Sequence, residues 1–371
     1  MRCAYYESET CRSCSQIETP YGAQLAAKQS VCRDLLGDHA GLVWLPAVAS
    51  AEEAFRNKAK MVVTGTADEP RLGILDPRGG GVDLRRCPLY SPAMHDLLGV
   101  LADFISAAGL TPYDLADRRG ELKHVLVTES PDGEFLVRWV LRSTEAVPRI
   151  RKHLADLLGA HPEIAVVSVN LQPEHKAVLE GDVEEVLTER TVLPMRVNGL
   201  ALRLPPRSFF QTNSNVAAAL YRQAVEWADD VAPASVLDLY CGVGGFALHL
   251  AGPGRQVLGI EASAEAVAGA IDAAREAELE AAFECGDATA HSIEADLVVV
   301  NPPRRGIGAE LAARLDESAA RSVIYSSCNA ASLARDLAAM PSWTPRRARV
   351  LDMFPHTEHY EVVVLLDRTS I

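Results

Sequence analysis

The sequence predicts an α/β fold in which an open, mostly parallel sheet follows a mixed, β-rich amino-terminal half. The first observation is a buried strand, residues 235–239, that runs into the glycine-rich turn Gly242-Val243-Gly244-Gly245. The second is that strand-like and helix-forming segments alternate from there to the carboxyl terminus, which is typical of βα units. The later strand-like segments are residues 256–260, 296–300, 322–325, 349–353 and 360–366.

Length and composition describe an ordinary globular protein with room for two domains. The 371 residues carry a net charge of −14, which argues against binding nucleic acid through bulk charge but does not exclude a local basic groove. Apolar runs fall well short of the roughly 20 residues needed to cross a membrane, and the amino terminus lacks the apolar core of a signal peptide. We therefore expect a cytoplasmic protein.

Four cysteines form a candidate metal site. Cys3, Cys11 and Cys14 are spaced C-x7-C-x2-C, and Cys87 follows much later, directly before a proline. Four thiolates suit zinc or an iron–sulfur cluster. A zinc ribbon would usually carry a second C-x2-C pair, whereas a proline after the last cysteine occurs in some ferredoxins, and the spacing alone leaves both metals open. Cys32 is a weaker candidate, and unpaired thiols in a loop-rich module are the alternative.

Two basic clusters in the first half are candidates for contact with phosphates. Alternation in the strand-like run that begins near residue 58 places Arg56, Lys58 and Lys60 on one face. The second cluster, residues 118–124, runs into another strand-like segment. An ordinary solvated face is the alternative reading of both clusters.

The domain boundary is expected at Pro205-Pro206, because two prolines exclude regular ladder pairing. This divides the chain into a mixed α+β domain, residues 1–205, and an α/β domain, residues 206–371. The helical segment near residues 20–40 is a candidate for packing on the second domain.

The glycine-rich turn favours a nucleotide cofactor. Its pattern is G-x-G-G, where a dinucleotide fingerprint would read G-x-G-x-x-G. Glu261 ends the next strand and is placed to accept hydrogen bonds from ribose hydroxyls. Acidic residues near both strand ends favour S-adenosylmethionine over a nicotinamide cofactor, and Asp287 is a weaker candidate for a place near the adenine. The alternative is an α/β domain with an unrelated turn.

Asn301-Pro302-Pro303, after the strand 296–300, is a turn typical of methyltransferases. Enzymes that methylate exocyclic amines place an aromatic residue directly after this turn, whereas this chain has Arg304. Methylation of an amine is therefore less favoured. The thiol of Cys328, at the end of the following strand, offers a different chemistry. We expect the site to lower the thiol pKa below its usual value of about 8.5, with Arg304 or Arg305 and the next helix supplying the favourable field. A buried structural cysteine is the alternative.

The last two strand-like segments enclose a polar stretch. Residues 349–353 and 360–366 are expected to form a hairpin that inserts antiparallel and completes a seven-stranded sheet. Carboxylates and imidazoles beside a cofactor site are candidates for proton transfer, and solvated or structural side chains are the alternative. The candidates here are His356, Glu358, His359 and Glu361.

Together these residues resemble the uracil-C5 RNA methyltransferases of the TrmA/RumA superfamily, and within it the RlmC (RumB) group. The motifs that carry the resemblance are the four cysteines, FRNKAKMVV, RGELKH, SFFQTN, DLYCGVGGF, VNPPRRGIG, IYSSCN and DMFPHTEHYE, which extend from Cys3 almost to the carboxyl terminus. Superfamily members often begin with an extra β-barrel domain, whereas this chain starts at the cysteine cluster, as the RlmC group does. The resemblance implies a Rossmann-like class I S-adenosylmethionine-dependent methyltransferase domain preceded by an iron–sulfur and RNA-binding domain.

The resemblance also implies methylation of a uridine in 23S ribosomal RNA through a covalent adduct between cysteine and C6 of uracil. Cys328 would be the nucleophile and Glu361 the base. The residues that would hold S-adenosylmethionine are Gln211, Tyr240, Glu261 and Asn301, and many superfamily members carry Asp at the last position. The residues that would ligate a [4Fe–4S] cluster are Cys3, Cys11, Cys14 and Cys87. Neither a membrane nor an obligate protein partner is implied.

Other functions stay open at this point. They are methylation of a different ribosomal or transfer RNA site, methylation of an amine or a cytosine, and RNA binding without catalysis by a protein whose cluster senses oxidants. A cytosine-C5 enzyme would carry its cysteine after a proline, which Cys328 does not follow. If the substrate is RNA, the basic clusters would bind phosphates, and Phe209 would stack on displaced bases.

Overall fold

The computed structural model describes residues 1–37, 39, 41–176 and 178–369, and the chain divides into two compact units. Each unit is assembled from separate stretches of sequence. The first unit comprises Met1–Cys14, Glu52–Met195 and Pro205–Arg207. The second unit comprises Ser15–Ala51, Arg196–Leu204 and Ser208–Ile371. Residues 15–51 and 196–204 thus belong to the second unit, although both stretches precede the expected boundary at residue 205.

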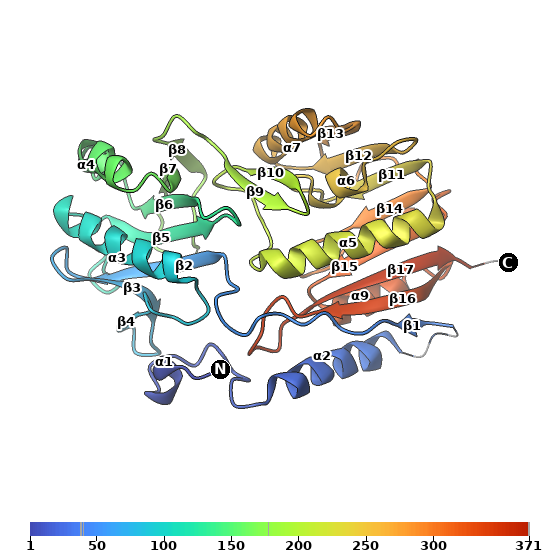
Figure 1. Ribbon diagram of the computed structural model, residues 1–371, viewed down its shortest axis with the longest axis horizontal. Helices are drawn as coiled ribbons and strands as arrows, with labels where there is room; N and C mark the ends of the chain where they lie inside the picture. Colours follow the sequence, from blue (N-terminus) through green and yellow to red (C-terminus); the bar gives the residue numbers. More distant parts are fainter. Residues whose placement is uncertain (38, 40, 177, 370–371) are drawn as a thin grey trace. The chain divides into compact units, whose positions relative to one another are not determined.

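The first unit is built on a seven-stranded sheet with the order β4-β3-β2-β5-β6-β7-β8 (Figure 1). Only the β6–β7 pair is parallel among these described strands, because helix α4 makes the crossover between them. The strands are β2 (Lys58–Gly65), β3 (Pro70–Leu75), β4 (Gly81–Asp83), β5 (Leu122–Glu129), β6 (Phe135–Leu141), β7 (Ile164–Leu171) and β8 (Val183–Val186). The helices are α1 (Ala4–Glu7), α3 (Pro92–Ala107) and α4 (Val147–Ala160).

Helices α3 and α4 pack against one face of this sheet and form its core. On β2, Ala59, Met61 and Val63 are buried in that core. Lys58 and Lys60 alternate with them and therefore point to the opposite face, as the sequence pattern predicts. On β5, Val125 and Val127 lie in the core and His124 alternates with them.

The second unit is built on an eight-stranded sheet with the order β1-β16-β17-β15-β14-β11-β12-β13. The pairs are parallel except where β17 lies between β15 and β16. The strands are β1 (Val43–Trp44), β11 (Ser235–Leu239), β12 (Gln256–Glu261), β13 (Ala281–Cys285), β14 (Leu297–Val300), β15 (Ser322–Ser327), β16 (Trp343–Leu351) and β17 (Glu361–Arg368). The hairpin of β9 (Leu193–Val197) and β10 (Leu200–Leu204) forms a separate two-stranded sheet.

The predicted count of seven strands is wrong by one. The eighth strand, β1, pairs with β16 through only two residues, Val43 opposite Arg347 and Trp44 opposite Ala348. Two residues are too few to show a period of alternation, so no sequence pattern distinguishes this strand from a loop. The antiparallel insertion of the last strand, β17, agrees with the prediction.

Helices cover both faces of the second sheet. Buried residues of α2, α8 and α9 share one core with alternate residues of β11, β14 and β15. On the other face, α6 packs against β11 and β12, and α5 packs against α6. The helices are α2 (Tyr21–Leu36), α5 (Ser214–Val231), α6 (Gly245–Leu250), α7 (Ala264–Glu276), α8 (Gly308–Glu317) and α9 (Ala330–Ala338). None of the helices in the described ranges is both long and apolar enough to span a bilayer.

Candidate active site

Cys328 lies at the carboxyl edge of the second sheet. Strand β15 ends one residue earlier, and Asn329 caps α9 by accepting a hydrogen bond from the Ala331 amide at 3.2 Å. The thiol is therefore presented just past a strand end, where it is partly exposed. Open α/β sheets bind their ligands at this edge.

The surroundings of Cys328 raise the pKa of its thiol. Burial is the largest cause, the negative charge of Glu361 adds to it, and the Arg304 guanidinium opposes both. The prediction that the site lowers this pKa is therefore wrong. Partial removal from water and a nearby carboxylate outweigh the favourable field of Arg304. Arg305 acts instead on Tyr240, where burial raises the pKa of the phenol and the charge of Arg305 opposes that rise.

Glu361 is the first residue of β17, and its neighbour Val362 lies opposite Ser327 on β15. The carboxyl group is buried and accepts a hydrogen bond from the hydroxyl of Ser326, two residues before Cys328. Burial raises the pKa of Glu361 to about 7, and the Ser326 hydrogen bond opposes that rise. Sequence reasoning missed Ser326, because only the order of the strands reveals that it faces Glu361.

The other candidates for proton transfer lie in different environments. Glu358 and His359 are exposed. His356 is fully buried, and its backbone amide donates to Oε1 of Gln24 at 2.9 Å while its carbonyl accepts from the Gln16 amide at 2.9 Å. Of these four side chains, Glu361 is the one whose negative charge raises the pKa of the Cys328 thiol.

The turn after β11 is shaped for close approach by a ligand. Tyr240, Gly242 and Gly244 adopt left-handed backbone conformations, with φ of +64°, +55° and +83°. A Cβ atom at Gly245 would lie 2.4 Å from the hydroxyl oxygen of Tyr221, so this position requires glycine. The turn therefore exposes backbone at the carboxyl edge of the sheet, as a nucleotide-binding turn does.

Asp238, in β11, supports the fit of S-adenosylmethionine to this turn. Its Oδ2 accepts a hydrogen bond from the Ala247 amide at 2.9 Å, whereas Oδ1 is buried without a hydrogen-bond partner in the described part of the chain. Burial raises the pKa of Asp238 to about 8. A buried carboxyl group with one unused oxygen matches a cationic donor, such as the ammonium group of the cofactor's methionine moiety.

Three of the four residues predicted to hold the cofactor share one edge of the sheet. Tyr240, Glu261 and Asn301 follow or end the neighbouring parallel strands β11, β12 and β14. The Glu261 carboxylate accepts from the Gly242 amide at 3.1 Å and from the Ser263 amide at 2.9 Å, which ties the two strand ends together. The fourth residue, Gln211, is buried in the segment that precedes α5.

The loop after Asn301 is held by Asp336 of α9. The Asp336 carboxylate accepts from the Ile307 amide at 2.8 Å and from the Tyr325 hydroxyl at 2.7 Å. Gly306 has φ of +85°, and a Cβ there would lie 2.1 Å from the same carboxylate. The helix that begins after Cys328 therefore holds the loop that carries Arg304 towards the thiol.

The amino-terminal cysteines gather in the first unit. Burial raises the pKa of Cys14 to about 12, and the charges of Cys87, Cys11 and Cys3 add to the effect. None of these four thiols forms a disulfide in the structure. Cys32, the weaker candidate, is fully buried in the core of the second unit. In the described ranges, no three His, Cys, Asp or Glu side chains converge tightly enough to hold a single metal ion.

Comparison with known proteins identifies the family to which this chain belongs. A general methyltransferase-domain model matches residues 236–303. The 23S rRNA (uracil(747)-C(5))-methyltransferase RlmC of Halothiobacillus neapolitanus is 50% identical over 99% of this chain and 100% of its own length. RlmC of Yersinia pseudotuberculosis is 48% identical over 99% of each chain.

A solved structure has the same architecture. The tRNA (uracil-54, C5)-methyltransferase of Pyrococcus abyssi, in complex with S-adenosyl-L-homocysteine, superposes with a TM-score of 0.79 and 25% identity. The match covers 95% of this chain and 85% of that one. With near-full-length relatives at about half identity, this chain belongs to the RlmC family of RNA (uracil-C5)-methyltransferases.

Proposed function

We propose that this protein methylates C5 of a uracil in 23S ribosomal RNA, at the position that its curated relatives name 747. The observation that carries the proposal is the proximity of Cys328 and Glu361 at the carboxyl edge of a methyltransferase-type sheet. A thiol beside a carboxyl group that titrates near neutral pH is suited to covalent catalysis on a pyrimidine.

Cys328 would act as the nucleophile. Its thiolate adds to C6 of uracil, and the electrons of the C5–C6 double bond shift to give an enolate with density on C5. When bound, S-adenosylmethionine would supply the methyl group that C5 accepts, and its sulfonium sulfur would keep the electrons of the broken S–CH3 bond. Because the reacting carbons lie within the base stack of folded RNA, the target uridine has to leave its stack to reach the thiol.

Glu361 would act as the base. As a carboxylate it removes the proton from the methylated C5, and the electrons of that C–H bond re-form the C5–C6 double bond. The C6–sulfur bond breaks in the same step, which returns Cys328 as a thiolate. A pKa of about 7 lets one carboxyl group take up this proton and release it to solvent.

Gln211, Tyr240, Glu261 and Asn301 would hold the methyl donor. The left-handed turn at Tyr240 and the unused oxygen of Asp238 support this assignment, because both offer polar groups at the edge that Cys328 shares. Asn301 can donate as well as accept a hydrogen bond, whereas the Asp of many superfamily members only accepts as a carboxylate.

We also propose that Cys3, Cys11, Cys14 and Cys87 ligate a [4Fe–4S] cluster. A four-iron cluster is larger than one ion, so its thiolate ligands need not converge on a point. Uracil methylation requires no electron transfer, which favours a structural or RNA-positioning role. A ribosomal RNA substrate favours a cytoplasmic location.

The test is methylation of deproteinised 23S ribosomal RNA with labelled donor, followed by mapping of the product. Wild-type protein should place one methyl group on C5 of a single uridine and release tritium from C5. Cys328→Ala should abolish methylation and the covalent adduct with 5-fluorouracil RNA. Glu361→Gln should accumulate the adduct, because elimination stalls. Methylation of an amine or a cytosine, or full activity of Cys328→Ala, would refute the proposal.

A further inference from the structure

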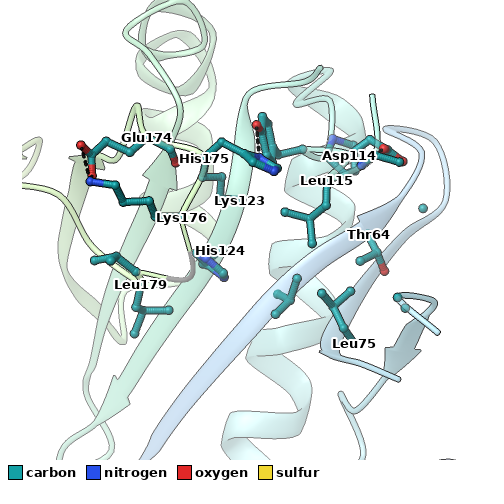
Figure 2. Close-up of a pocket in the computed structure, with 18 of the residues that line it drawn as sticks. Thr64, Leu75, Asp114, Leu115, Lys123, His124, Glu174, His175, Lys176 and Leu179 are labelled. Atoms are coloured by element: carbon teal, nitrogen blue, oxygen red, sulfur yellow. Dashed lines mark hydrogen bonds and ion pairs between the residues drawn. The ribbon is translucent and has the colours of Figure 1, made fainter. Parts of the chain in front are cut away.

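The first unit contains a cavity of about 800 Å³ whose described lining includes no residue assigned above to catalysis. This volume falls within the roughly 300–1,000 Å³ typical of small-ligand sites. The floor is the sheet face opposite α3 and α4, with Val62 and Thr64 of β2 and His124 of β5 (Figure 2). The walls are the loops around Leu115 and around Glu174, and we call the whole the sheet-face cavity.

Non-covalent contacts join the walls of the sheet-face cavity. The Tyr113 hydroxyl lies 3.1 Å from Nδ1 of His175 and joins the two wall loops. Lys123 extends from the floor, donates to the Glu174 carbonyl at 2.7 Å and lies 4.7 Å from the centre of the Tyr113 ring. The predicted role of Lys123 in binding phosphate is therefore not supported, because this side chain is buried and already occupied.

The lining combines apolar surface with hydrogen-bonding edges. Leu75, Leu115 and Leu179 lie around the same space as the imidazole of His124 (Figure 2). Burial lowers the pKa of His124 to about 4, so its ring is neutral at pH 7 and has one donor and one acceptor nitrogen. Apolar contact combined with hydrogen-bond donors and acceptors suits an unstacked nucleobase, which has apolar faces and polar edges.

Two lysines lie on the same face of β2 as the floor of the sheet-face cavity. Lys58, Lys60, Val62 and Thr64 occupy alternate positions on β2 and therefore share one face. Lys60 is exposed, and Arg78 lies on the cavity rim. Cations beside a mixed cavity suit a ligand that carries phosphates on both sides of a base, as a nucleotide within an RNA strand does.

We propose that the sheet-face cavity binds an unstacked nucleobase of the RNA substrate other than the uracil that reacts. The inference rests on the proposed function, because that function makes RNA the ligand. Bound there, the base would fix the register of the RNA on the first unit, and Lys60 and Arg78 would contact the flanking phosphates.

Leu115→Asp tests the proposal, because Leu115 is 52% exposed at the cavity wall and its replacement leaves the core intact. Val183→Asp is the matched control, since Val183 is 56% exposed in the same unit but does not line the cavity. A carboxylate in the cavity should repel RNA and displace the base, so Leu115→Asp should raise the Kd and KM for a 23S ribosomal RNA fragment at least about fivefold. Its kcat at saturating RNA should stay within about twofold of wild type, because the RNA still reaches Cys328 once bound.

Val178→Asp, on the opposite wall and 50% exposed, should repeat the result if Leu115→Asp folds poorly. Photocrosslinking of RNA that contains 4-thiouridine should label peptides from the cavity walls in wild type but not in Leu115→Asp. Equal RNA affinity of Leu115→Asp, Val178→Asp and Val183→Asp would overturn the cavity proposal even if methylation proceeds normally. Absence of methylation by the wild-type protein would instead refute the proposed function.

Discussion

At the scale of single residues, the contact between Ser326 and Glu361 sets the protonation of the proposed base. The Ser326 hydroxyl donates to a carboxyl group that burial alone would hold protonated well above the ordinary range. A base has to be deprotonated to act, so the rate should rise with pH through about 7, the pKa of Glu361.

Ser326→Ala should move that rise to higher pH, because it removes the hydrogen bond that stabilises the carboxylate. At pH 6.5 the variant should lose activity, and at pH 9 it should recover most of it. Ser326→Thr keeps the hydroxyl and should keep the wild-type profile. The pH dependence of single-turnover methylation is the measurement, and an unchanged profile for Ser326→Ala would show that this hydroxyl does not tune the base.

Arg304 should control the reactivity of Cys328, because its charge is the favourable influence on a thiol whose pKa is otherwise raised. Arg304→Gln should slow alkylation of Cys328 by iodoacetamide at pH 7 about threefold, which corresponds to half a pKa unit. Arg305→Gln is the control, since Arg305 acts on Tyr240. Mass spectrometry of the Cys328 peptide over time gives the rate, and equal rates in both variants would contradict this role.

At the scale of elements, helix α2 secures the segment between β16 and β17. Lys28 donates to Oδ1 of Asp352 at 2.7 Å and to the Phe354 carbonyl at 3.0 Å, and both charged side chains are almost fully buried. Gln24 bonds the same segment through the His356 amide. The stretch that leads into Glu361 is therefore anchored to a helix more than 300 residues earlier in the chain.

Lys28→Met should destabilise the second unit by about 3–5 kcal/mol, because it leaves the buried Asp352 carboxylate without its cation. The double variant Lys28→Met/Asp352→Leu should be less destabilised, since it removes both charges. Lys152→Met, on the exposed surface of α4, controls for the substitution itself. Urea denaturation followed by tryptophan fluorescence provides the measurement, and equal midpoints for Lys28→Met and Lys152→Met would refute the anchoring role.

The elements show where sequence patterns suffice and where they do not. The predicted strand 235–239 agrees with β11 (Ser235–Leu239), because a buried apolar run followed by a glycine-rich turn marks it in the sequence. Helix α3 was not predicted, although Ser91 caps it and a proline stands in its first turn. Strand β1, with two residues, is too short to carry a periodic signal.

At the scale of the whole molecule, the predicted site residues are far apart in sequence but gather because of the strand order. Cys328 and Glu361 meet because β17 inserts beside β15, which the hairpin prediction anticipated. Ser326 remained without a role because its partner, Glu361, depends on packing that no local pattern records. The thiol pKa was predicted in the wrong direction for the same reason, since burial is a property of the folded chain.

The four amino-terminal cysteines allow a prediction about the first unit. Cys87→Ser should lose the iron and the visible absorbance of a cluster, and it should lower the stability of this unit, because one of four ligands is gone. Cys285→Ser, exposed and in the second unit, should keep both. Anaerobic purification with iron and sulfide analysis provides the measurement. Iron content equal in the two variants would remove Cys87 from the ligand set.

The tie between Lys28 and Asp352 also sets an order of events during protein synthesis. A ribosome makes α2 early, but the partner of Lys28 emerges only after 324 further residues have been translated. Until then α2 lacks this buried ion pair, and Cys328 is added to the chain before its base, Glu361. A nascent polypeptide therefore cannot become a competent enzyme before its final strand has been translated.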